Sequence, residues 1–405
     1  MSQHRPDPIA RSNALTDVRQ LAAESLEWRS TTQYAIEDAL EGKQLASGVT
    51  AKQDIPARSH ATMDGYAIDA TESYPFRVRD AEIFPEDTAS ELGPGEAVSV
   101  ATGAPIPSSA NAVIKIEEVT VTDGQLTGPP VSPGTYVYER ASNVRTGEQL
   151  FEPGERLSAK DTILLRDLGY ESVECYEPLS VGLLATGSEI HEGKTDDFDS
   201  PMLASLIRSW GHAPAFEGTV PDEYERVRST VDSLATEHDV VMTTGGTSVG
   251  KKDYAVRALS DLGEVVFHRV ALRPGKPIAA ARLPDHDAVA FAIPGKPIGA
   301  HAVTTLVCRP FFTGETRLPT VSARASVSVA VPTPGFEYVI PVMLDGDEAL
   351  ALGHRDSPVS IYAETFDPSV LSSTTRVSRA DGFVLTETGF ETGETVSVVP
   401  YEVVE

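Results

Sequence analysis

The segment D-V-V-M-T-T-G-G-T-S-V-G-K-K-D-Y, residues 239–254, decides the fold of this chain. Its apolar start is typical of a buried strand, and two threonines then lead into Gly245-Gly246. We therefore predict a strand, a glycine-rich loop and a helix. Glycine has no Cβ, so such a loop lets backbone N–H groups approach an anion closely. The segment predicts either an anion-binding loop, with Lys251 and Lys252 adding charge, or a plain turn after a strand.

The surrounding residues, 179–312, alternate between short apolar runs and amphipathic runs. This alternation predicts a mainly parallel sheet with helices on both faces. The predicted strands are 181–185, 213–216, 240–243, 265–270, 278–281 and 289–292, and the predicted helices are 201–210, 223–236, 254–261 and 298–312. Ligands of such sheets bind beyond the carboxyl ends of the strands. We expect three glycine-containing loops to meet there, at residues 186–189, 245–250 and 293–297.

The flanking sequence has a different character. Residues 11–42 carry apolar positions at helical spacing, which predicts two helices, the second capped by Thr31 or Thr32. Residues 51–140 are short β-rich runs between Pro and Gly turns, and residues 159–168 return to a helical pattern. We expect this later helix to pack on the N-terminal pair, so that the β-rich region is an insertion.

The chain is thus predicted to be multidomain, α/β plus all-β. At 405 residues it is long enough for several hydrophobic cores. The predicted domains are a helical and extended domain I (1–50 and 141–178), an inserted β domain II (51–140), an α/β domain III (179–316) and a C-terminal β-barrel domain IV (317–405).

Acidic residues outnumber basic ones, 60 to 33, which gives a formal net charge of −27. This charge argues against a nucleic-acid partner. No window has the roughly 20 consecutive apolar residues of a membrane helix, and the N-terminus lacks a signal-peptide core, so we expect a cytoplasmic protein without a membrane partner. The two cysteines have no partner spacing, which argues against a disulfide framework or a structural zinc site.

Several sequence blocks carry a family resemblance. They are M-D-G-Y-A (63–67), T-G-A (102–104), N-V-R-T-G-E (143–148), T-G-S-E (186–189), R-P-G-K-P (273–277) and I-P-G-K-P (293–297). Together with the 239–254 segment, and in this order, they resemble the MoeA family of molybdopterin molybdenumtransferases, of which the E domain of gephyrin is an animal relative. The resemblance covers nearly the whole chain and weakens after residue 312.

The resemblance implies a homodimer whose domain III has a Mog-like fold, that of molybdopterin adenylyltransferases. It implies insertion of molybdate into adenylylated molybdopterin with release of AMP, assisted by a divalent metal, usually Mg²⁺. The site would lie between domain III of one subunit and domain II of the other. Two other interpretations remain: a molybdopterin adenylyltransferase, or a non-catalytic paralogue that binds molybdopterin. A molybdopterin adenylyltransferase is also a possible partner.

The resemblance also assigns roles to residues. Asp64 and Thr102 would face the molybdate, and Arg145 would hold an anion or the pterin phosphate. The expected catalytic residues are Asp64, Glu189, Asp253 and Lys276. The expected Mg²⁺ ligands are Glu189, Asp222 and Asp253, because carboxylate oxygens suit this hard cation. The remaining ligand-binding residues would be Thr186, Gly187, Gly245, Gly246, Ser248, Arg273, Pro294, Gly295 and Lys296.

Some of these residues have a simpler structural interpretation. Asp222 and Asp253 could cap the helices that follow them, and Asp64 could stabilise a turn. Glu189 could be a solvated loop acid. Lys296 could strengthen anion binding or only form an ion pair.

The chain also departs from the family pattern. Lys296 and Pro201 stand where the family usually has Asn, and Gln149 stands where it prefers Asp. Ser369 is a loose match to the C-terminal glycine-serine motif. The changes at Lys296 and Pro201 slightly favour the non-catalytic paralogue.

The dispersed acidic charge predicts a salt-adapted protein, with an acidic mesophilic enzyme as the alternative. Salt screens the repulsion between scattered carboxylates, so we expect the urea midpoint of unfolding to rise between about 0.1 M and about 3 M KCl. Stability that stays constant over this range would contradict salt adaptation.

Overall fold

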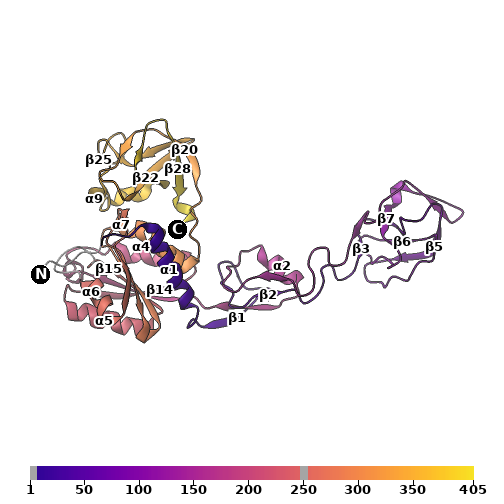
Figure 1. Ribbon diagram of the computed structural model, residues 1–405, viewed down its shortest axis with the longest axis horizontal. Helices are drawn as coiled ribbons and strands as arrows, with labels where there is room; N and C mark the ends of the chain where they lie inside the picture. Colours follow the sequence, from indigo (N-terminus) through magenta and orange to yellow (C-terminus); the bar gives the residue numbers. More distant parts are fainter. Residues whose placement is uncertain (1–6, 247–253) are drawn as a thin grey trace. The chain divides into compact units, whose positions relative to one another are not determined.

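The computed structural model describes residues 7–246 and 254–405. The chain divides into two compact units, one made of Met1–Ser30 and Glu177–Glu405 and the other of Thr31–Tyr176. Figure 1 shows the elements of both units. Within the described ranges, no helix is long and apolar enough to cross a membrane.

A six-stranded sheet forms the centre of the first unit. Its strands are β13 (Ser180–Thr186), β14 (Ala213–Val220), β15 (Val240–Thr244), β16 (Glu264–His268), β18 (Ala279–Leu283) and β19 (Ala288–Ile293), in the order β14-β13-β15-β19-β18-β16. The first four strands of this order are parallel, and β18 and β16 are antiparallel to their neighbours. The short turn η2 (Pro284–His286) joins β18 to β19, which only antiparallel neighbours permit. The mainly parallel sheet is therefore confirmed.

Helices cover both faces of this sheet. One face carries α1 (Arg11–Ser25), α4 (Asp199–Ser209), α7 (Pro297–Val303) and α8 (Arg309–Thr313), and the other carries α5 (Tyr224–Glu237) and α6 (Tyr254–Leu262), which lie side by side (Figure 1). Met242 packs into the first face and Val241 into the second, because neighbouring strand residues point to opposite sides. Both faces are buried, which explains the continuous apolar run in the sequence. The helix predicted over 298–312 contains a π-helical turn, Thr304–Cys308, between α7 and α8.

The N-terminal region differs from the prediction. Only its first helix forms, and the second is wrong: Thr31–Ala35 is a strand, β1, paired antiparallel with β12 (Ser172–Tyr176). Helix α1 buries Ala14, Val18 and Leu21 in the core of the α/β sheet. The first 30 residues therefore belong with 177–405, whereas the prediction grouped residues 1–50 with 141–178.

The predicted helix over 159–168 is present as α2 (Asp161–Asp167), but its predicted packing on the N-terminal helices is wrong. Its Leu165 packs in the second unit with Ile36, Leu40 and Phe151. The same core includes β2 (Val49–Thr50) and β11 (Gln149–Phe151).

The inserted β region of the second unit is a six-stranded sheet of order β7-β4-β6-β5-β9-β8. Its strands are β4 (Gly65–Ile68), β5 (Phe76–Ile83), β6 (Glu96–Val100), β7 (Ala112–Lys115), β8 (Thr120–Thr122) and β9 (Gln125–Thr127), and a separate pair joins β3 (His60–Ala61) to β10 (Val137–Tyr138). The small β domain expected from the alternation of β-rich runs and turns is thus present.

The C-terminal strands close into a five-stranded barrel, as predicted. They are β20 (Val321–Ala325), β22 (Glu337–Asp345), β23 (Glu348–Ala351), β26 (Gly382–Thr386) and β28 (Thr395–Pro400), and β22 closes the ring by pairing with both β23 and β26. The short pairs are β21 (Val329–Ala330) with β27 (Gly389–Phe390) and β24 (Gly353–His354) with β25 (Ser360–Tyr362). Strand β17 (Leu272–Arg273), from the α/β part of the chain, pairs with β22, and residues 357–373 contain α9 (Pro368–Leu371).

The packing of α1 predicts a specific loss of stability. Leu21 is 1% exposed in the α/β core, so Leu21→Ala should lower the free energy of unfolding by about 2–4 kcal/mol. Arg19→Ala, on the exposed side of the same helix, is the matched control and should cost less than about 0.5 kcal/mol. Urea unfolding measures both, and equal losses would contradict this placement of α1.

Candidate functional site

A pocket of about 480 Å³ opens where β15 and β19 end. Its walls come from loops that the sequence analysis singled out and from α9 of the C-terminal region. The lining residues are Gly245, Gly246, Arg273, Pro274, Gly275, Lys276, Pro277, Pro294, Gly295, Lys296, Gly299, Pro368, Ser369 and Ser372. Three of these are cationic, and no described lining residue is acidic. In a chain of net charge −27, the pocket is therefore a local concentration of positive charge, which favours anions.

Two glycines let the pocket loops approach other parts of the chain. Gly245 has a φ of +80°, and a Cβ there would lie 2.6 Å from the Thr186 carbonyl oxygen. Gly275 has a φ of +116°, and a Cβ there would lie 2.2 Å from Cγ1 of Val303. Neither position accepts a side chain, since both the backbone conformation and the space exclude it.

Hydrogen bonds hold three loops together at this edge of the sheet. Thr186 Oγ1 donates to the Thr244 carbonyl at 2.9 Å, and the Gly245 N–H donates to the Ile293 carbonyl at 3.0 Å. The Gly187 N–H donates to the Val220 carbonyl at 3.1 Å. The predicted residues Thr186 and Gly187 thus support the pocket loops without lining the pocket.

Neutral groups position two of the pocket cations. Cζ of Arg273 lies 3.9 Å from the centre of the Phe336 ring, and Nζ of Lys296 donates to the Ser369 carbonyl at 2.9 Å. Lys276 lies near the same ring, with its Nζ 5.8 Å from the ring centre. An aromatic face and a carbonyl carry no formal charge, so they orient Arg273 and Lys296 without neutralising them. Lys296 forms no ion pair within the described ranges.

The structure places Glu189 and Asp222 on neighbouring turns. The Asp222 N–H donates to Ser188 Oγ at 3.0 Å, and the Ser188 N–H reaches Asp222 Oδ2 at 3.5 Å. Asp222 therefore braces α3 (Ser188–His191). Glu189 is exposed, and its carboxylate lies over Gly187.

The described residues contain no group of three or more His, Cys, Asp or Glu side chains that could hold a metal. Mg²⁺ commonly takes one or two carboxylates and completes its shell with phosphate oxygens and water, so Glu189 and Asp222 have the oxygen chemistry that this cation prefers. Asp253 and Ser248, also predicted to be site residues, lie outside the described residues.

Three other predicted residues belong to the second unit. Oδ1 of Asp64 accepts hydrogen bonds from the Thr102 hydroxyl at 2.7 Å and the Thr102 N–H at 2.6 Å, and these bonds lower the pKa of the Asp64 carboxyl. Asp64 and Thr102 are thus brought together. Arg145 is exposed on a separate turn, where its N–H donates to Glu148 Oε2 at 3.1 Å.

The site also includes groups that the sequence analysis did not select. Asp199 is 5% exposed, and its Oδ2 lies 4.0 Å from where a Cβ of Gly295 would be. Burial raises the pKa of Asp199 to about 7, the Asp197 carboxylate adds to this, and Asp199 Oδ1 has no hydrogen-bond partner. A signal in the sequence was available, because Asp199 lies two residues before Pro201, which departs from the family pattern. Ser372 and Phe336 had no such signal.

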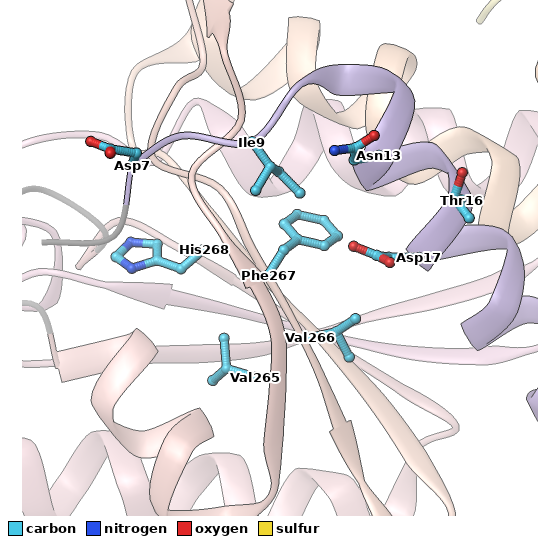
Figure 2. A pocket seen from close by; sticks show the side chains of 9 residues that line it. All are labelled: Asp7, Ile9, Asn13, Thr16, Asp17, Val265, Val266, Phe267 and His268. Atoms are coloured by element: carbon cyan, nitrogen blue, oxygen red, sulfur yellow. The ribbon is translucent and has the colours of Figure 1, made fainter.

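A second cavity, of about 600 Å³, shows that size does not identify the site. Figure 2 shows its lining side chains, which come from the N-terminal segment, α1 and β16. It contains none of the predicted site residues and has two carboxylates, Asp7 and Asp17, which disfavour an anion. Burial raises the pKa of Asp17.

The fold and the pocket define a multidomain protein built around an α/β domain with a cation-lined pocket at the carboxyl ends of its parallel strands. Residues 182–314 match the protein family described as probable molybdopterin binding domain. Residues 10–169 match the MoeA N-terminal region, domains I and II. The two matches cover more than two-thirds of the chain, and the chain belongs to the MoeA family.

Individual relatives agree with this assignment. The chain is 28% identical over 398 residues to the molybdopterin molybdenumtransferase of Bacillus subtilis, which covers 91% of this chain and 89% of that protein. It is 29% identical over 302 residues to the Haemophilus influenzae protein of the same name, with 71% and 73% covered. It is also similar to the crystal structure of the molybdopterin biosynthesis MoeA protein of Pyrococcus horikosii, with a TM-score of 0.71, 26% identity and coverage of 98% and 99%.

The buried Asp199 predicts a dependence of stability on pH. Its folded pKa of about 7 lies above the ordinary 3.8, so the folded state keeps a proton that the unfolded chain releases. Asp199 therefore destabilises the fold increasingly as pH rises from about 4 to about 7, by at most about 4 kcal/mol.

The variant Asp199→Asn removes this titration while keeping the shape of the side chain. It should raise the melting temperature at about pH 8 and have little effect at about pH 4. Asp196→Asn, an exposed neighbour, is the control and should change neither value. An equal shift at both pH values would show that Asp199 does not titrate in this way.

Proposed function

We propose that this protein inserts molybdate into adenylylated molybdopterin and releases AMP, as a transferase of molybdenum cofactor biosynthesis. Membership of the MoeA family supports the pathway, since the relatives are named molybdopterin molybdenumtransferases. The observation that carries the proposal is the pocket of about 480 Å³, which has three cations and no acid among its described lining residues.

The pocket has the groups that a tetrahedral oxyanion needs. The Arg273 guanidinium can donate two parallel hydrogen bonds, while Lys276 and Lys296 act as point charges. The glycine loop at Gly245-Gly246 brings backbone to the pocket surface; because the Gly245 N–H donates to the Ile293 carbonyl, the Gly246 N–H is the one that would approach an anion. The volume is in the range of small-molecule sites, which leaves room for part of an organic ligand beside the oxyanion.

The carboxylates of the first unit fit the expected metal. Glu189 and Asp222 would hold Mg²⁺, which when bound polarises the P–O bond to the adenylyl group and offsets charge on the departing phosphate. Ser188 holds Asp222 in place through two backbone–side-chain hydrogen bonds. These acids do not line the pocket, so they do not oppose an oxyanion inside it.

Asp64 suits a role as an ionised group. Two hydrogen bonds from Thr102 lower the pKa of the Asp64 carboxyl, so it remains a carboxylate at neutral pH. A carboxylate of this kind accepts hydrogen bonds from protonated ligand groups and is a poor proton donor. We also propose that the protein is a homodimer in the cytoplasm, as the resemblance implies.

The proposal predicts AMP release that requires molybdate. The protein is incubated with adenylylated molybdopterin, molybdate and Mg²⁺, and AMP is followed by chromatography. Lys276→Ala and Asp64→Ala should each lower the rate by about 10²-fold, because each removes a charged group that contacts the reacting ligand. Lys160→Ala, which removes an exposed lysine of the second unit, should leave the rate unchanged.

The other outcomes separate the alternatives. ATP consumption with molybdopterin as substrate would instead support a molybdopterin adenylyltransferase. Binding of adenylylated molybdopterin without turnover would support the non-catalytic paralogue. Full activity of the Lys276 and Asp64 variants would refute the roles given to these two residues.

A further inference from the structure

Lys296 connects the pocket to the C-terminal part of the chain. Its Nζ donates to the Ser369 carbonyl at 2.9 Å, and Ser372 Oγ donates to the same carbonyl at 2.9 Å. Two residues further along, the Ile298 N–H donates to the Ser372 carbonyl at 3.0 Å. The start of α7 and the short helix α9 are therefore joined by one side-chain and one backbone hydrogen bond.

The carbonyl that receives Lys296 is itself fixed. Oδ1 of Asp367 accepts from the N–H groups of Ser369 and Val370, at 2.9 and 3.2 Å, and so caps α9. Leu371 of the same helix is fully buried in the barrel core. A long, exposed lysine side chain ordinarily samples many rotamers. Here its ammonium group is held at the pocket rim by a rigid partner.

The contact with Ser369 leaves the charge of Lys296 available. An ammonium group has three N–H donors, and the Ser369 carbonyl takes one of them. The acid nearest in sequence to this partner, Asp367, is engaged by backbone N–H groups of α9. The other cations that line the pocket are Arg273 and Lys276. Lys296 can therefore donate to a pocket ligand while it remains bound to α9.

We propose that Lys296 strengthens the preference of this pocket for doubly charged tetrahedral oxyanions over singly charged ones of the same shape. The inference rests on the proposed function and defines the charge class of the oxyanion substrate. Coulomb energy is proportional to the charge of the anion, so one cation contributes twice as much free energy to a dianion as to a monoanion. Shape alone would not separate the two.

Molybdate and perrhenate test this difference, because both are tetrahedral and they carry two charges and one charge at neutral pH. Lys296→Met keeps a side chain of similar length and removes the charge. We expect it to weaken molybdate binding about tenfold and perrhenate binding about threefold, since a halved free energy is the square root of the fold-change. Lys296→Arg should keep the preference of the wild type for molybdate.

The experiment is calorimetric titration of the full chain with each anion at one ionic strength, because screening changes with salt. Lys160→Met is the control and should bind both anions as the wild type does. Circular dichroism and urea unfolding check that each variant is folded.

Each outcome decides a separate question. If Lys296→Met weakens the binding of both anions by the same factor, or the binding of neither, Lys296 does not discriminate between the anions by charge and the inference fails. In that case the proposed function stands, provided that the wild type binds molybdate. If the wild type binds neither molybdate nor perrhenate, the proposed function fails together with the inference.

Discussion

The close approach of two loop backbones is the constraint on which the pocket depends. A Cβ on Gly295 would lie 3.0 Å from Cα of Gly245, so the loops after β15 and β19 touch without side chains between them. These strands are parallel neighbours, and their loops therefore leave the same edge of the sheet. Gly275 packs against α7 in the same way, which brings Arg273 and Lys276 to this edge. Glycine is unfavourable inside a helix or a strand, but at these loop positions it determines where the cationic side chains lie.

The C-terminal barrel affects these cations mainly by holding their side chains in place, and less by adding charge. The ring of Phe336 lies against Arg273, and the Ser369 carbonyl receives Lys296. Strand β17, which contains Arg273, is itself paired with β22 of the barrel. An α/β domain alone would carry the same charges on less constrained side chains, at a larger cost in rotamer entropy on binding. The barrel is therefore a structural part of the anion pocket.

The sequence predicted those parts of the fold whose signal is local. The strand predicted at 240–243 is observed as Val240–Thr244, because apolar residues buried on both faces form an unbroken run. The helix predicted after Thr31 fails, since Thr31–Ala35 pairs with a strand about 140 residues later that local periodicity cannot detect. The glycine loops of the site were identifiable from composition. The burial of Asp199 and the place of α9 depend on tertiary partners.

Two of the departures from the family pattern, Pro201 and Lys296, each stand in place of an asparagine. Pro201 lies in the first turn of α4, where Asp197 already accepts from the Asp199 and Ser200 N–H groups, and a missing N–H there costs no helical hydrogen bond. What Pro201 loses relative to asparagine is the side-chain amide and its hydrogen bonds. Lys296 also replaces an asparagine amide, but with a cation. Asp199, whose pKa is raised by burial, adds little negative charge behind Gly295 below neutral pH. At its pocket the chain thus has a positive charge, that of Lys296, where the family has an amide, and the buried Asp199 opposes that charge little below neutral pH.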